Sequence, residues 1–273
     1  MSGVLIEASD AARPIRVLSE ADYADWTDGR GWLDASGFQA KPGAFALFPS
    51  ADGADVAGAI LIAEPDAGLW TLAAAANAAP ALDWRLAGAP DAAFAERFAL
   101  AWALDRYRFD RYRGEEERAK PMARLVWPDG VDRKRVAALA GGVRMARDLV
   151  NTPASDLGPM ELAGAAAMFA EQAGGEIAIT VGDDLLAKNF PMIHAVGRAA
   201  AQAPRLIDLR FGRAGAPKIA IVGKGVCFDS GGLDLKPRQA MKIMKKDMGG
   251  AASALGLAAA LRGMALDLDV RVL

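Results

Sequence analysis

The chain has 273 residues, 53% of them apolar and 24% charged, which is enough to bury a sizeable core and argues against disorder. With 32 basic and 34 acidic residues its net charge is −2, so composition excludes the strongly basic surface typical of proteins that bind nucleic acid or acidic membranes. One cysteine and one histidine exclude a disulfide framework and a metal site built on several thiolates or imidazoles.

The amino-terminal residues lack the pattern of a secretion signal or a membrane anchor. In MSGVLIEASDAARP the acid Glu7 interrupts the apolar run before a signal-peptide core can form. Elsewhere the longest apolar stretches, such as AASALGLAAAL, are too short to cross a bilayer. We therefore expect a soluble cytoplasmic protein with no membrane partner.

Short apolar runs separated by turn residues characterise residues 1 to about 130. The runs GVLIEA, IRVL, GAFALF and GAILIA alternate with Pro and Gly, which predicts the strands of a small mixed domain. A helical pattern follows from about Asp91 to Tyr112, where apolar residues recur at spacings of three and four. The segment PMARLVWPDG, residues 121–130, is then interpreted as a linker or domain edge.

The second half of the chain alternates helices with strands. Pro153 should end a first helix, and Gly174-Gly175 should end a second one that starts at a proline. Helices are expected at residues 136–150, 159–173 and about 249–261, and strands in the runs EIAITV, RLIDLRF, KIAIVG and LDLDVRVL.

This order of elements predicts an α/β fold with two domains. A small N-terminal mixed α/β domain over residues 1–125 precedes a second α/β domain over residues 126–273, in which helices flank a central sheet. The last run, DVRVL, alternates as a strand does and stops at Leu273 with no following turn or helix. Because a sheet edge that ends in an apolar run invites aberrant pairing, we expect the second domain to be truncated at its C-terminal side.

The densest chemistry lies in IVGKGVCFDSGGLDLKP, residues 221–237, and in MKKDMGGAA, residues 244–252. A phosphate-binding loop is one alternative, but neither G-x-x-x-x-G-K-[ST] nor G-x-G-x-x-G occurs there. Solvated surface charges beside a tight glycine turn are a second alternative. A ligand site is the third, because loops converge at strand ends and a lysine that has lost its proton can join two carboxylates around a cation.

These two segments resemble the leucyl aminopeptidase family, the cytosolic dinuclear-metal aminopeptidases. The family pattern runs G-K-G-x-x-F-D-S-G-G-x-x-x-K-P and then K-x-D-M-G-G-A-A. The segments RDLVNTPASDLGPMELA, AVGRAAAQAPRLIDLRF and YRFDRY resemble further landmarks of the family. The resemblance covers roughly residues 105–260 and implies that residues 126–273 form a catalytic metallopeptidase domain.

The resemblance implies a role for four side chains. Lys224, Asp229 and Asp247 would be metal ligands, with Asp229 bridging two divalent ions, zinc or manganese. Lys236 would be the catalytic electrophile and would donate to the scissile carbonyl and the developing oxyanion. The ions would activate a water and hold the free α-amine of the substrate. That contact with the amine would make the enzyme an exopeptidase.

The second signature of the family, an N-T-D-A-E-G-R segment, does not occur in the sequence. In the family it supplies the remaining acidic ligands and an arginine that holds bicarbonate as the general base, so this chain by itself would hold an incomplete site. The resemblance further implies that a homohexamer hydrolyses N-terminal, leucine-like residues from short peptides. The alternative is a non-catalytic or truncated paralogue that keeps the fold for binding or assembly.

Several other residues have a structural explanation beside a functional one. Met244 and Met248 would line the pocket for an apolar first side chain or pack between helices. His194 lies among apolar residues, which favours a packed histidine over a ligand, and Cys227 is interpreted as a small buried filler. RYRFDRYR interleaves arginine with aromatic residues as a nucleic-acid-binding face does, but the adjacent GEEER offsets its charge, so we expect no nucleic-acid partner.

Overall fold

The computed structural model describes residues 3–88 and 90–273. The chain divides into two compact units, Met1–Ala140 and Gly141–Leu273, at a point inside helix α6 (Arg133–Asn151). We predicted a domain boundary between residues 125 and 126, before this helix begins; the division falls within the helix because its residues enter the cores of both units. None of the described helices combines the length and the hydropathy needed to span a bilayer.

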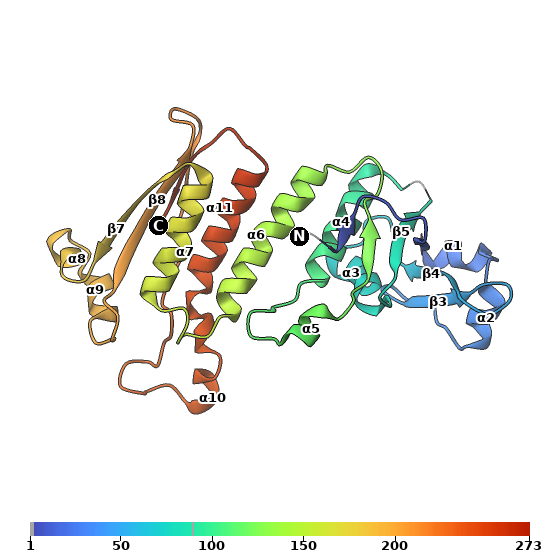
Figure 1. The fold of residues 1–273 in the computed structure, drawn as a ribbon, viewed down its shortest axis with the longest axis horizontal. Helices are drawn as coiled ribbons and strands as arrows, with labels where there is room; N and C mark the ends of the chain where they lie inside the picture. Colours follow the sequence, from blue (N-terminus) through green and yellow to red (C-terminus); the bar gives the residue numbers. More distant parts are fainter. Residues whose placement is uncertain (1–2, 89) are drawn as a thin grey trace. The chain divides into compact units, whose positions relative to one another are not determined.

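Among its described residues, the first unit forms a six-stranded sheet in the order β1-β6-β5-β2-β4-β3 (Figure 1). Neighbouring strands are parallel except for β3, which is antiparallel to β4. The strands are β1 (Leu5–Ile6), β2 (Arg13–Leu18), β3 (Phe45–Pro49), β4 (Val56–Ile62), β5 (Asp83–Ala87) and β6 (Arg124–Val126). The helices are α1 (Glu20–Asp25), α2 (Arg30–Ala35), α3 (Leu69–Ala78), α4 (Ala92–Asp105) and α5 (Glu115–Ala119).

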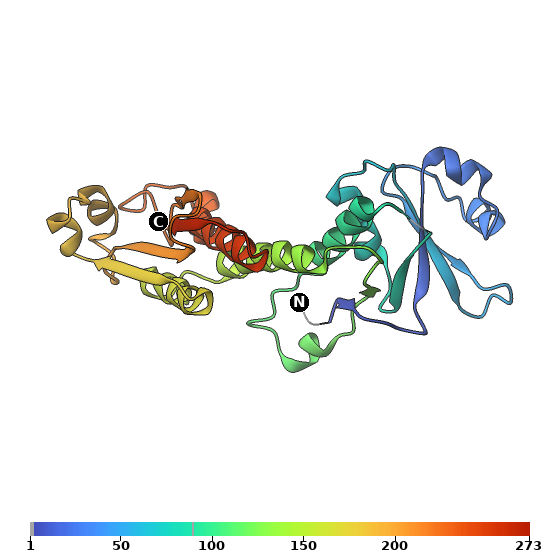
Figure 2. The same ribbon diagram turned by 90° about the horizontal axis from the view of Figure 1, so that it is seen from above.

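Helices cover both faces of this sheet, as strand β4 shows (Figure 2). Ala59 and Leu61 belong to the apolar cluster that includes α3 and α4, whereas Ile60 and Ile62 belong to the cluster that includes α1 and α2. Successive residues of a strand point to opposite faces of its sheet. A strand covered on both faces is therefore a continuous apolar run, as in GAILI, and does not alternate with polar residues.

Helix α4 ends at Asp105, and the prediction that it reaches about Tyr112 was wrong. The backbone N–H of Arg106 makes the closing bond to the carbonyl of Trp102 at 3.0 Å. Phe109 and Tyr112 lie in the loop that follows and contact each other edge to face, with ring centroids 5.9 Å apart. The residues whose spacing predicted the helix, Phe94, Phe98, Ala101, Trp102 and Asp105, all lie within α4, so the spacing was right and only the C-terminal limit was set too far.

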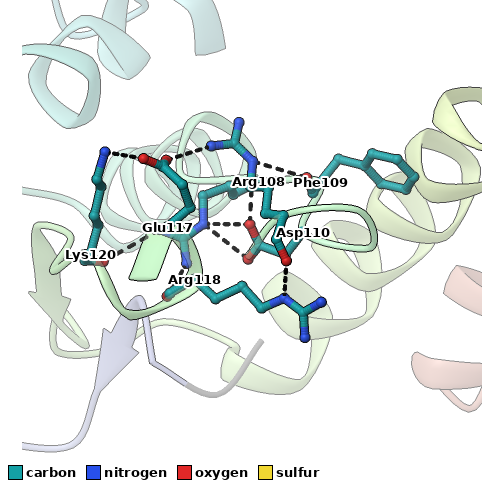
Figure 3. A network of polar contacts seen from close by, with 7 residues as sticks. Arg108, Phe109, Asp110, Glu117, Arg118 and Lys120 are labelled. Atoms are coloured by element: carbon teal, nitrogen blue, oxygen red, sulfur yellow. Dashed lines mark hydrogen bonds and ion pairs between the residues drawn. The ribbon is translucent and has the colours of Figure 1, made fainter. Parts of the chain in front are cut away.

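The loop after α4 is folded around the guanidinium group of Arg108 (Figure 3). This group pairs with Asp110 at 2.7 Å and donates to the carbonyl oxygens of Arg118 at 2.5 Å and Lys120 at 3.3 Å. The ammonium group of Lys120 pairs in turn with Glu117. Arg108 and Lys120 are thus engaged by acids and carbonyls of residues 110–120, and the expectation of no nucleic-acid partner stays a prediction.

We expect Arg108→Lys to loosen this loop, because an ammonium group cannot make the three bonds of the guanidinium group at once. Loss of one charge-assisted hydrogen bond should raise the open population about ten-fold. Cleavage by a glutamate-specific protease at Glu115–Glu117 measures that population. The exposed Arg111 offers the control Arg111→Lys, and equal cleavage rates for the two variants would contradict the prediction.

In the part of the second unit that the structure describes, four strands form a sheet in the order β7-β8-β10-β9 (Figure 1). β10 runs antiparallel to β8 and parallel to β9, and β7 runs antiparallel to β8. The strands are β7 (Glu176–Val181), β8 (Arg205–Gly212), β9 (Lys218–Ile221) and β10 (Asp269–Val272). The helices are α7 (Pro159–Ala173), α8 (Asp184–Ala187), α9 (Pro191–Gly197), α10 (Arg238–Met241), the 3₁₀ helix η1 (Met244–Met248) and α11 (Gly249–Gly263).

Helices α7 and α11 pack on one face of this sheet. Leu209 of β8 and Val270 of β10 are buried in one cluster with Leu162 of α7 and Leu255 of α11. Helix α7 ends as predicted, because Gly174 takes a left-handed conformation with φ of 64°. The fold class predicted from the sequence, a mixed α/β domain followed by an α/β domain with a central sheet, is confirmed.

Glycines let α6 and α11 approach each other closely within the second unit. A Cβ atom added at Gly256 would lie 2.5 Å from the carbonyl oxygen of Gly142, and one added at Gly142 would collide with the carbonyl oxygen of Gly256. At neighbouring Gly141, an added Cβ would meet nothing within 4 Å. The backbones of the two helices therefore touch at this pair of positions.

The opposite face of the sheet carries an ion pair. The guanidinium group of Arg271 donates to the two carboxylate oxygens of Asp208 at 2.9 and 2.7 Å, across the β8–β10 pair. The hydrogen bonds from Arg271 hold the pKa of Asp208 below its usual range. Because this pKa is lower in the folded state, the pair stabilises the fold above the unfolded pKa of about 3.9 and its contribution disappears as the pH falls through the folded value.

We accordingly expect Asp208→Asn to lower the free energy of unfolding by about 0.5–1 kcal/mol at pH 7. The difference from the unsubstituted chain should begin to shrink below the unfolded pKa of about 3.9 and approach zero as the pH falls through the lowered pKa of the folded carboxylate. Urea unfolding at pH 7 and pH 3 measures both values. A deficit of the same size at both pH values would show that the charge of Asp208 does not stabilise the fold.

Candidate metal centre

In the sequence, the two segments that carry the lysines and aspartates lie between β9 and β10, which are parallel neighbours in the sheet. β9 is followed by a loop at residues 222–237, then by α10, η1 and α11, and the chain returns in β10 beside β9. The loop thus leaves the carboxyl end of β9 (Figure 1). In α/β sheets this is the position at which ligand crevices form, because loops converge there on a rigid support.

A tight turn shapes the D-S-G-G part of the loop. Gly231 and Gly232 have φ of 80° and 103°, in the left-handed region that favours glycine. The N–H of Gly231 donates to Oδ1 of Asp229 at 2.8 Å, and the hydroxyl of Ser230 donates to the carbonyl of Gly232 at 2.8 Å. The N–H of Lys236 then donates to the carbonyl of Ser230 at 3.0 Å, so the turn brings Lys236 back to Asp229.

Two ion pairs contain all four residues singled out in the sequence. Nζ of Lys236 lies 2.5 Å from Oδ2 of Asp229, and Nζ of Lys224 pairs with Oδ2 of Asp247. The second pair joins the two motifs, because its members are 23 residues apart. The side chain of Asp247 is 19% exposed and that of Lys224 is 56% exposed, so this pair is open to solvent from the lysine side.

Asp229 is held in its ionised form. The hydrogen bond from Lys236 lowers the pKa of Asp229, and the backbone N–H of Gly231 and the charge of Lys224 lower it further. A carboxylate must be ionised to bind a metal ion. Lys224 thus acts on Asp229 while it pairs with Asp247, so the four side chains share one electrostatic environment.

Glycines bring the two motifs into backbone contact. A Cβ atom added at Gly223 would lie 2.5 Å from the carbonyl oxygen of Gly250, and one at Gly250 would lie 2.7 Å from the backbone nitrogen of Lys224. The N–H of Ala251 also donates to the carbonyl of Lys224 at 2.8 Å. The absence of a side chain at Gly250 therefore makes room for the backbone of the first motif.

The two methionines have different surroundings. Sδ of Met244 lies 3.4 Å from Nζ of Lys236, so this side chain borders the ion pairs. Met248 is fully buried and belongs to the apolar cluster of the second unit. The structure therefore supports the packing alternative for Met248 and leaves Met244 beside the candidate site.

Cys227 and His194 have structural surroundings. Cys227 lies in the apolar cluster of the second unit, and burial raises the pKa of its thiol to about 11. His194 is in α9, with Nε2 3.1 Å from Oδ1 of Asp183, and its side chain is 17% exposed. A single imidazole paired with one carboxylate fits the predicted packed histidine.

The sequence reasoning missed the bonds that shape the loop, above all those of Ser230. The D-S-G-G composition was the available signal, because Asp and Ser before glycines are typical of turns. Among residues 3–88 and 90–273, no three His, Cys, Asp or Glu side chains are grouped to hold a metal ion.

Two family models match the chain, one for each half. The M17 aminopeptidase N-terminal domain matches residues 13–128, and the catalytic domain of the cytosol aminopeptidase family matches residues 144–273. Both candidate motifs lie within the second match.

Known relatives agree with these matches. A probable cytosol aminopeptidase of Rhizobium etli is 40% identical over an alignment of 179 residues that covers 61% of this chain and 36% of the relative. A cytosol aminopeptidase structure from Coxiella burnetii is 37% identical with a TM-score of 0.88, over 98% of this chain and 59% of that chain. The bottromycin maturation enzyme BotP in complex with Mn is 32% identical with a TM-score of 0.80, over 96% and 58%.

Proposed function

Because the chain belongs to the cytosol aminopeptidase family, M17, we propose that its second unit carries part of the metal centre of an aminopeptidase. Such an enzyme removes N-terminal residues, leucine-like ones above all, from short peptides. The proposal rests on one observation: two ion pairs, Lys224–Asp247 and Asp229–Lys236, lie at the carboxyl end of β9. In α/β sheets, ligand sites lie at the carboxyl ends of the strands, which is where these charged groups are found.

The donor set fits a divalent cation in part. Asp229 and Asp247 offer carboxylate oxygens, which suit manganese and zinc, and Lys224 offers an amine that can bind once its proton is lost. Three side chains are too few to complete two coordination shells, so further ligands must come from outside this set. When bound, the ions supply Lewis acidity that polarises a peptide carbonyl and makes a water nucleophilic near neutral pH.

Lys236 would act on the substrate directly. Its ammonium group is held by Asp229 on one side and borders Met244 on the other, which fixes the direction of its N–H groups. A fixed cation of this kind donates to the carbonyl oxygen of the scissile bond and stabilises the negative charge that develops there. Met244 would then contact the first side chain of the peptide, for which an apolar thioether is suitable.

Assembly, location and cofactor choice belong to the same proposal. A homohexamer in the cytosol with two zinc or manganese ions, and bicarbonate as the general base, is what the family resemblance suggests. The manganese in the structure of one relative supports the choice of Mn²⁺ as the first ion to test.

The test is the release of leucine from a leucyl peptide by the purified chain with and without Mn²⁺, together with Mn²⁺ binding followed by electron paramagnetic resonance. Asp229→Asn should abolish both signals, whereas Asp234→Asn, an exposed aspartate of the same loop, should change neither. The left-handed φ of 57° at Asp234 is well tolerated by asparagine, so this control should preserve the loop.

Three outcomes separate the alternatives. Leucine release that needs Mn²⁺ and Asp229 would support the aminopeptidase. Mn²⁺ binding without release would favour a protein that keeps the fold and the ion site for binding or assembly. If Mn²⁺ binds equally well to the unsubstituted chain and to Asp229→Asn, the proposed centre is wrong.

A further inference from the structure

A lysine of the second motif contacts the end of a distant helix. Nζ of Lys245, in η1, donates to the carbonyl oxygen of Asn151 at 2.7 Å, across 94 positions of sequence. Asn151 is the last residue of α6, and the carbonyl groups at the end of a helix carry partial negative charge. A cation is the most favourable partner for such a group.

Apolar contacts accompany this bond. Met248, at the other end of η1, is fully buried in the same cluster as Leu149 of α6. A Cβ atom added at Gly249 would lie 3.8 Å from a methyl group of Val150. The short turn that carries Asp247 is therefore held against the last turn of α6 by one charged hydrogen bond and by packing.

We infer that Lys245 is a positioning residue of the candidate metal centre: it fixes the turn that carries Asp247 to the end of α6. The ligand role of Asp247 rests on the proposed function, whereas the attachment of the turn does not. The inference also gives a role to the N-T-P segment, which ends α6 at the residue whose carbonyl accepts the hydrogen bond from Lys245.

The first test is amide hydrogen exchange of the metal-free chain. Lys245→Met keeps the aliphatic stem but removes the donor, and it should raise exchange at residues 244–249 about ten-fold. Lys246→Met, at the exposed neighbouring lysine, is the matched control and should leave these amides unchanged. Lys245→Arg should restore protection, because a guanidinium group can also donate to the carbonyl. If Lys245→Met does not fold, Lys245→Leu, which also lacks a donor, replaces it.

The second test is Mn²⁺ affinity of the same variants. We expect Lys245→Met to bind Mn²⁺ about ten-fold more weakly, with Lys245→Arg close to the unsubstituted chain. Equal exchange at residues 244–249 in Lys245→Met and Lys246→Met would overturn the inference, and so would equal Mn²⁺ affinity in the two. If the unsubstituted chain binds no Mn²⁺, the metal centre proposed above fails, while raised exchange in Lys245→Met alone would still uphold the attachment.

Discussion

Lys236→Ala is expected to lower the rate of leucine release about 100- to 1,000-fold while Mn²⁺ stays bound. The lysine would donate to charge that develops on the carbonyl oxygen, so its removal should affect kcat more than KM. It also neutralises Asp229 across 2.5 Å, so without it the carboxylate should attract Mn²⁺ at least as strongly as before. Steady-state kinetics and Mn²⁺ titration measure the two effects separately.

The control is Lys242→Ala, which removes an exposed lysine between α10 and η1. Its kcat and its Mn²⁺ affinity should equal those of the unsubstituted chain. If Lys236→Ala keeps full turnover, Lys236 is not the electrophile. If instead it loses turnover and Mn²⁺ together, Lys236 supports the ion site and does not act on the substrate.

Gly142→Ala is expected to destabilise the second unit by about 1–3 kcal/mol, although alanine is the better helix former. The added methyl group would collide with the backbone carbonyl of Gly256, which cannot rotate away as a side chain can. Gly141→Ala, one position earlier in the same helix, meets open space and should stabilise the chain by about 0.5–1 kcal/mol. Thermal and urea unfolding of the two variants should show shifts of opposite sign.

This pair of substitutions tests the α6–α11 contact itself. Helix propensity alone predicts that both substitutions stabilise the protein. A stabilising effect at both positions would mean that the two helices are further apart than the structure has them. Gly256→Ala should resemble Gly142→Ala, because its methyl group would lie 2.5 Å from the carbonyl oxygen of Gly142.

Local signals in the sequence were sufficient for most elements of the fold. Pro153 and Gly174 end their helices because backbone chemistry near proline and glycine depends little on tertiary contacts. Where no such signal marked an end, as between Asp105 and Tyr112, the helix was extended too far. The pairing of β10 between β8 and β9 could not be predicted, since strand order depends on contacts distant in sequence.

For the candidate site, the sequence supplied the residues but not their pairing. Lys224, Asp229, Lys236 and Asp247 were singled out by motif, and the structure places them in two ion pairs. Which lysine meets which aspartate depends on the turn at Ser230 and on backbone contact between the motifs, neither of which a motif records. The roles of these four side chains stay predictions until the substitutions above are measured.

The buried thiol of Cys227 can be used to measure how often the segment around it becomes exposed to solvent. With a pKa of about 11, roughly one thiol in a thousand is ionised at pH 8, and thiol reagents attack the ionised form. Reaction with an aromatic disulfide should therefore wait for transient exposure of the segment that carries both Lys224 and Asp229. Because the sequence contains a single cysteine, the colour released during labelling would time that exposure without any engineered probe.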